Sequence, residues 1–183
     1  LYPVSLILLA LALIIYLAWA AKNLIFFIKP PPDTALIMTG PGDKKTVHFT
    51  GATVWPLVNK KVFVPMPHLP VQILLLSSEA LICRDNVHVE TRVTFYLKLN
   101  AKPEDILTAI ETMGLYDIYN VNAVSKKFKG PFVKALRDLA REMAFQQIIN
   151  DRVMFCRQLA KTADVNLNGY KLLEVSLEYF KQI

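Results

Sequence analysis

The sequence lacks the residue combinations on which most enzymes depend. Its 183 residues include only two cysteines and three histidines, and none of them falls in a catalytic or metal-binding spacing. No GxSxG, HExxH, Walker A or GxGxxG pattern is present. Without a nucleophile beside a base, or a loop that cradles phosphate, we expect no catalysis, no cofactor and no metal. We interpret Cys83 and Cys156 as core residues in a reducing compartment.

Charge is absent from the N-terminal end, where the first charged residue is Lys22. Residues 4–21 form an uncharged run, VSLILLALALIIYLAWAA, of 18 residues. As a helix this run would be roughly 27 Å long, close to the hydrocarbon thickness of a bilayer. We therefore predict a transmembrane helix within residues 1–29, with Trp19 and Lys22 near the membrane surface. A cleaved signal peptide is the alternative, but the long run and the missing A-x-A site favour a retained anchor.

Lysine dominates the segment that follows this helix. Residues 22–61 contain six lysines and two aspartates. A positive flank predicts that this side faces the cytoplasm. The whole chain carries a net charge of +6, which is typical of proteins that bind nucleic acid or anionic lipid. Because many of the positive charges flank the predicted span, we expect anionic lipid as the partner and no nucleic acid.

A second basic cluster lies further along the chain, mixed with Asp138 and Glu142. We interpret it as a solvated helix face with subunit salt bridges, and contact with RNA or lipid headgroups is the alternative. Its members are Lys126, Lys127, Lys129, Lys134, Arg137 and Arg141.

Three prolines, residues 30–32, end the apolar segment and form a stiff spacer. Residues 33–100 are rich in β signals, and the strict alternation of Val87–Leu99 is the clearest. Before it, Arg84-Asp85-Asn86 predicts a hairpin turn. Further strands are expected at residues 34–39, 46–49, 61–64, 71–76 and 80–83.

Residues 101–183 change to helical spacing. The pattern predicts a helix that begins at Pro103 and ends at Gly114, a second that starts near Pro131, and a third capped by Asn150 or Asp151. A turn at Asn168-Gly169 then leads into a closing strand, residues 170–180. We therefore predict an α+β fold with a transmembrane helix (1–29), a proline spacer (30–32), a β-rich lobe (33–100) and an α/β lobe (101–183).

The β-rich lobe is more apolar than a small core requires, especially over residues 52–76. Aromatic and aliphatic side chains beside lysines are typical of a segment that lies at a membrane interface. The alternative is that Trp55 and Phe63 are ordinary core residues. We predict that five residues of this lobe contact the membrane: Trp55, Leu57, Lys60, Lys61 and Phe63.

Several short segments, in a fixed order, resemble the SPFH or band 7 family of stomatins, prohibitins, flotillins and HflK/HflC-type bacterial proteins. The stretch PVQILLLSSEALICRDNVHVE is most similar to bacterial flotillin-like members. The other segments are residues 32–40 (PDTALIMTG), 51–57 (GATVWPL), 62–66 (VFVPM), 84–89 (RDNVHV), 132–137 (FVKALR), 148–152 (IINDR) and 168–175 (NGYKLLEV).

The resemblance implies a two-lobed SPFH domain behind a membrane anchor, in the plasma or inner membrane. It implies a scaffold that assembles with copies of itself into large rings or cages and organises a microdomain of lipids and proteins. An adaptor that regulates a membrane protease or transporter is the alternative. The family pattern also leads us to expect a coiled coil beyond Ile183, and the start at Leu1 leads us to expect residues before it.

Overall fold

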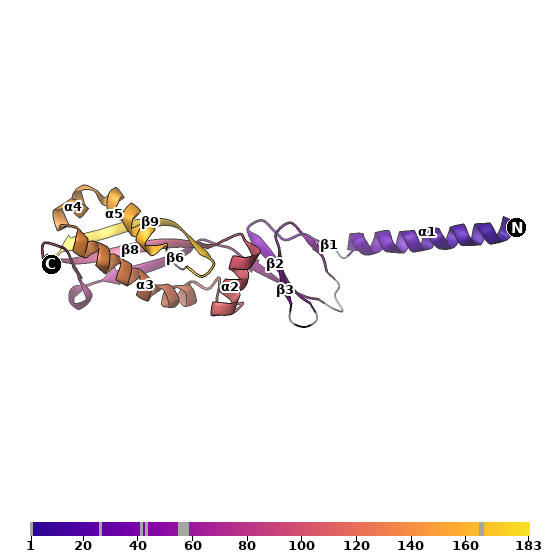
Figure 1. The fold of residues 1–183 in the computed structure, drawn as a ribbon, viewed down its shortest axis with the longest axis horizontal. Helices are drawn as coiled ribbons and strands as arrows, with labels where there is room; N and C mark the ends of the chain where they lie inside the picture. Colours follow the sequence, from indigo (N-terminus) through magenta and orange to yellow (C-terminus); the bar gives the residue numbers. More distant parts are fainter. Residues whose placement is uncertain (1, 26, 41, 43, 55–58, 165–166) are drawn as a thin grey trace. The chain divides into compact units, whose positions relative to one another are not determined.

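The computed structural model describes residues 2–25, 27–40, 42, 44–54, 59–164 and 167–183. They fall into two compact units, Leu1–Pro65 with two small sheets and Met66–Ile183 with one larger sheet (Figure 1). Helices and strands both occur in quantity, so the predicted α+β class is confirmed.

The first unit begins with helix α1, Tyr2–Ile25, which covers most of the predicted anchor. Its described side chains are apolar, and its large ones from Ile7 to Trp19 are 50–70% exposed. No helix in the described part of the chain is long and apolar enough to cross a membrane.

The strands of the first unit are short and antiparallel. β2 is the central strand of a three-stranded sheet with the order β3-β2-β5, while β1 and β4 pair with each other. Leu36, Ala52 and Val54 form a small buried cluster, with Ile28 and Met38 packed against it. The strands are β1 (Phe27–Ile28), β2 (Thr34–Thr39), β3 (Lys45–His48), β4 (Ala52–Thr53) and β5 (Lys60–Pro65).

In the second unit one long strand, β8 (His88–Leu99), organises the sheet. It pairs along one edge with β6 (Leu69–Leu75) and β7 (Leu81–Ile82), and along the other with β9 (Tyr170–Gln182). The alternation predicted for β8 is confirmed, because Val89, Val93 and its other residues of the same parity are buried.

Helices cover that buried face of the sheet (Figure 1). Phe132 of helix α3 stacks on Phe95 of β8, with ring centroids 4.3 Å apart. The remaining elements are the 3₁₀ turn η1 (Ser77–Glu79), α2 (Pro103–Met113), α3 (Val121–Glu142), α4 (Phe145–Asn150) and α5 (Arg152–Ala163).

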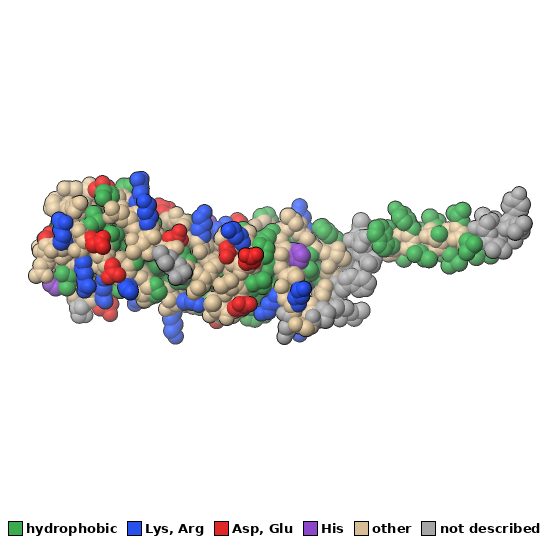
Figure 2. Space-filling view, viewed as in Figure 1, with side chains coloured by type: hydrophobic (Ala, Val, Ile, Leu, Met, Phe, Trp, Pro, Cys, Tyr) green, Lys and Arg blue, Asp and Glu red, His purple; other side chains and the backbone are tan. Residues whose placement is uncertain are grey.

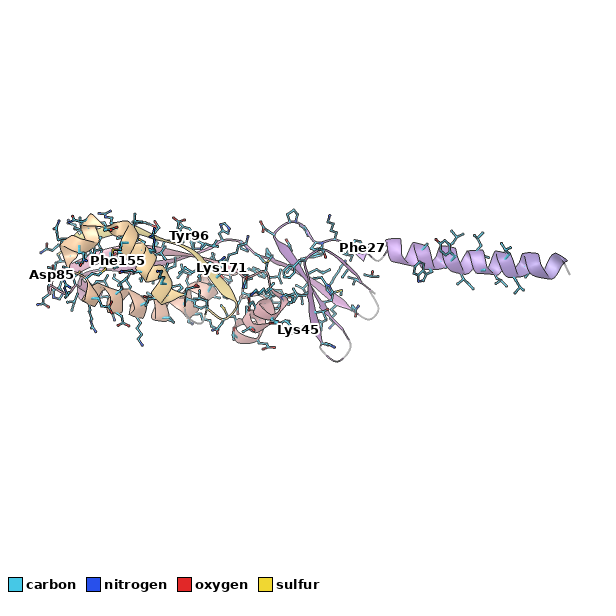
Figure 3. All side chains as sticks on the ribbon, turned by 45° about the horizontal axis from the view of Figure 1, so that its top comes forward. Phe27, Lys45, Asp85, Tyr96, Phe155 and Lys171 are labelled. Atoms are coloured by element: carbon cyan, nitrogen blue, oxygen red, sulfur yellow. The ribbon has the colours of Figure 1, made fainter. Side chains whose placement is uncertain are left out.

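The hairpin turn before β8 is hydrogen-bonded to the chain just after the C-terminal end of α3. The backbone N–H of Arg84 donates to the Met143 carbonyl at 3.1 Å, and the Phe145 N–H donates to the Asp85 carboxylate at 3.1 Å. Asp85 (Figure 3) thus caps α4, whose own N-cap residue, Ala144, has no side-chain acceptor.

The predicted lobes, 33–100 and 101–183, share one sheet, because β8 pairs with both β6 and β9. The two compact units divide between Pro65 and Met66. One helix boundary is corrected. The helix predicted to start near Pro131 starts at Val121, where the Asn120 side chain accepts the Asn122 N–H, and Pro131 lies inside it. Helix α4 was not predicted.

Candidate membrane-contacting and assembly surfaces

The two cysteines are free, and both are poorly suited to nucleophilic chemistry. Burial raises the pKa of Cys83 to about 11, and the nearby Asp85 carboxylate adds to the shift. Burial also raises the pKa of Cys156. A reactive cysteine has a lowered pKa, so both thiols stay protonated at neutral pH. Among the described residues, no group of His, Cys, Asp and Glu is placed to hold a metal ion.

The first candidate surface is α1 itself. Trp19 is 57% exposed, and its ring lies 6.4 Å from that of Tyr16. Figure 2 shows hydrophobic side chains along both visible edges of the described part of this helix. Lys22 lies in the last turn of α1, and its side chain is outside the described part.

The second candidate surface is on β5. Phe63 is 40% exposed and stands opposite Leu36 in the register with β2, while Lys61 stands opposite Met38. Residues two apart in a strand point to the same face, so Lys61 and Phe63 share a face that Lys60 does not. Lys60 and Lys61 are both exposed. Trp55 and Leu57 lie outside the described residues.

One further exposed aromatic residue of the first unit was not among the predicted membrane-contacting residues. Phe27 in β1 is 54% exposed and pairs with Thr53 (Figure 3). Phe27 lies in the apolar run 24–28, LIFFI, which falls within the predicted transmembrane segment, residues 1–29.

The third candidate surface is the face of the second sheet opposite α3. Strand register aligns Leu74, Arg92 and Tyr179 in one row across β6, β8 and β9. Leu74 is 40% exposed and Tyr179 is 38% exposed. Thr94, on the same face, donates a hydrogen bond to Glu178 at 2.6 Å. This mixed polar and apolar face is suited to contact with another protein surface.

The outer edge of β9 adds to this surface. Within the described residues, β9 (Tyr170–Gln182) pairs with β8 alone, through eleven residue pairs. An edge strand presents unpaired backbone groups that another chain can bind.

Comparison with known proteins gives two matches. A family model described as the SPFH domain / Band 7 family matches residues 28–181, which begin beyond α1. The chain is also 28% identical, over 152 residues, to the flotillin family inner membrane protein YqiK of Escherichia coli strain K12. That alignment covers 82% of this chain and 27% of the relative, so the chain spans about a quarter of the length of the curated relative it matches.

Proposed function

The chain belongs to the SPFH domain / Band 7 family, and we propose that it is a membrane-anchored scaffold subunit. Copies of it assemble side by side into large rings or cages that organise a microdomain of lipids and proteins. The observation that carries this proposal is α1, a helix whose large apolar side chains are exposed on the isolated chain.

An apolar helix of this kind requires a nonpolar environment. Ten large side chains of α1 are at least half exposed, and removing them from water would contribute on the order of 10 kcal/mol. We propose that residues 4–21 enter the bilayer as a single span, with Trp19 and Lys22 at the headgroups. The similar E. coli protein is named as an inner membrane protein, which agrees with this placement.

We further propose that the first unit touches the same membrane. Only one residue separates the end of α1 at Ile25 from the start of β1 at Phe27, and the proline spacer, residues 30–32, then leads into β2. Lys61 and Phe63 share an exposed face of β5, which suits lysine beside anionic headgroups and an aromatic ring in the interface. Trp55, Leu57 and Lys60 complete the proposed contact.

Assembly would use the open sheet face and the β9 edge. One anchor per subunit binds the membrane modestly, but many linked copies bind with high avidity. A row such as Leu74, Arg92 and Tyr179 offers a neighbour both apolar area and a charged hydrogen-bond donor.

Particle size tests this proposal. The full chain, extracted in a mild detergent, should appear in negative-stain images as rings or domes many times larger than one 20.7 kDa subunit. Tyr179→Lys, on the open sheet face, should reduce the particle mass measured by light scattering. Val153→Lys, on an exposed position of α5, is the matched control and should leave it unchanged.

Single subunits at every protein concentration would contradict the scaffold. They would favour the alternative, a membrane adaptor for a protease or transporter. Equal loss of mass in both variants would show that the sheet face is not the contact.

A further inference from the structure

The basic cluster of α3 forms one wall of a groove in the second unit. Five exposed cationic side chains line it, and they recur along one face of the helix over roughly 22 Å. The sixth cation of the cluster, Lys127, donates to the Thr112 carbonyl at 3.3 Å instead. The five that line the groove are Lys126, Lys129, Lys134, Arg137 and Arg141.

The groove has a volume of about 550 Å³, and Glu79 of η1 also lines it. Gly130 and Val133 contribute small or apolar surface, and a Cβ atom at Gly130 would meet nothing within 4 Å. A smaller hollow of about 210 Å³ lies where Ala80 and Ile82 face the two arginines. Blue side chains gather at the lower left of Figure 2, over α3.

The charges in this groove are unbalanced. Five cations are accompanied by two acids, Glu79 and Asp138. Like charges three or four positions apart on a helix, such as Arg137 and Arg141, repel each other and destabilise it. An anionic ligand would relieve this repulsion, and the two guanidinium groups can each bind a carboxylate with two hydrogen bonds.

We propose that the α3 groove binds an acidic peptide segment of a partner protein. A single phosphate or headgroup would reach one or two of the cations, whereas a row over four helical turns matches a ligand with regularly spaced charges. Glu79, which also lines the groove, would repel an anionic bilayer. Val133 and Ile82 offer apolar contact to side chains between the acids, and Glu79 and Asp138 repel a continuous phosphate backbone but accept peptide N–H groups.

A fluorescent peptide tests the proposal on the full chain in neutral detergent. The probe is a fifteen-residue peptide with glutamate at every third or fourth position and leucine or alanine between, and its control has glutamine for glutamate. Fluorescence anisotropy should show saturable binding of the first peptide only. The double variant Arg137→Ser, Arg141→Ser should weaken binding about tenfold.

A matched double variant removes the same charge elsewhere. Arg152→Ser with Arg157→Ser on α5, where both arginines are exposed, should bind the peptide as the unchanged protein does. Circular dichroism melting should show that both variants fold.

Three results would overturn the proposal. The first is equal binding of the glutamine peptide, and the second is equal weakening in both double variants. The third is displacement of the peptide by glycerophosphoserine as effectively as by unlabelled peptide, which would assign the groove to a lipid headgroup.

Discussion

At the scale of single residues, Gly169 is the glycine of the second unit with the least room for a side chain. Its φ is +92°, and a Cβ atom there would overlap the Asp105 carbonyl oxygen and lie 2.8 Å from its carbon. The Gly169 carbonyl also accepts the Asn100 N–H at 3.0 Å, which ties β8 to the start of β9. Any side chain would therefore strain the turn and push α2 away.

We predict that Gly169→Ala lowers the free energy of unfolding by about 3 kcal/mol, measured by urea denaturation of the detergent-solubilised chain. Gly130→Ala is the matched control, because Gly130 lies in α3 with open space around it. It should raise stability by about 0.5–1 kcal/mol through helix propensity. Similar effects from both substitutions would show that the turn is not constrained.

The buried thiol of Cys83 makes stability depend on alkaline pH. Its pKa is raised from 9.0 to about 11 in the folded chain, so the folded state holds the proton more tightly than the unfolded state. This contribution is complete below pH 9 and is lost as the pH rises through 11. We predict that Cys83→Ala removes about 1–2 kcal/mol of the fall in unfolding free energy between pH 8 and pH 11.

Tyr170 also contributes to the loss of stability at alkaline pH, in the unchanged chain and in the Cys83→Ala variant alike. Burial also raises the pKa of its hydroxyl, which donates to the Ile118 carbonyl at 2.7 Å. Ionisation of Tyr170 therefore also lowers the free energy of unfolding at alkaline pH. The Cys83→Ala substitution does not change this contribution. If the variant and the unchanged chain lose equal stability, the Cys83 thiol is not buried as described.

At the scale of elements, the exposed side chains of β5 allow a test of the proposed membrane contact of the first unit. We predict that a shortened chain beginning at Phe27, which keeps β1, still sediments with liposomes that contain phosphatidylserine, at low salt. Lys61→Ser with Phe63→Ser should weaken that binding severalfold, because both side chains share one exposed face. Val153→Ser with Arg157→Ser, two exposed residues of α5, is the control. If the shortened chain stays wholly in the supernatant, the first unit does not contact the membrane.

The elements also show what the sequence could predict. Alternation located β8 and its buried face, and proline with acidic residues located the start of α2, because these signals are local. The Asn168-Gly169 turn was predicted for the same reason, and both residues have positive φ. The start of α3 is not predictable in this way, because proline is typical of a first helical turn whereas Pro131 lies inside the helix.

Signals that depend on distant residues were beyond sequence reasoning. The sequence of β8 does not reveal that this strand pairs with β9, which lies more than seventy residues further along the chain. The hydrogen bond from the Phe145 N–H to the Asp85 carboxylate likewise joins residues that are far apart in the sequence. The sequence shows the basic residues of α3 as a cluster. It does not show that η1 and β7 lie beside them and complete the groove.

At the scale of the whole molecule, the proposed topology has a direct test. Six lysines against two aspartates in residues 22–61 predict that this flank lies on the cytoplasmic side. We predict that a cysteine substituted for Lys44, an exposed residue before β3, is protected from an impermeant thiol reagent in intact cells. It should react once the membrane is permeabilised. Labelling from outside would reverse the orientation.

The pairing of β8 also sets the order in which the second unit can be completed during synthesis. β6 leaves the ribosome before β8, but Val89 of β8 pairs with Gln182, near the other end of the chain. At roughly 5–20 residues per second, β8 waits several seconds with one edge unpaired. A β9 strand from a neighbouring nascent copy could satisfy the same hydrogen bonds. Exchange of β9 between subunits is therefore the assembly error to which this fold is most exposed.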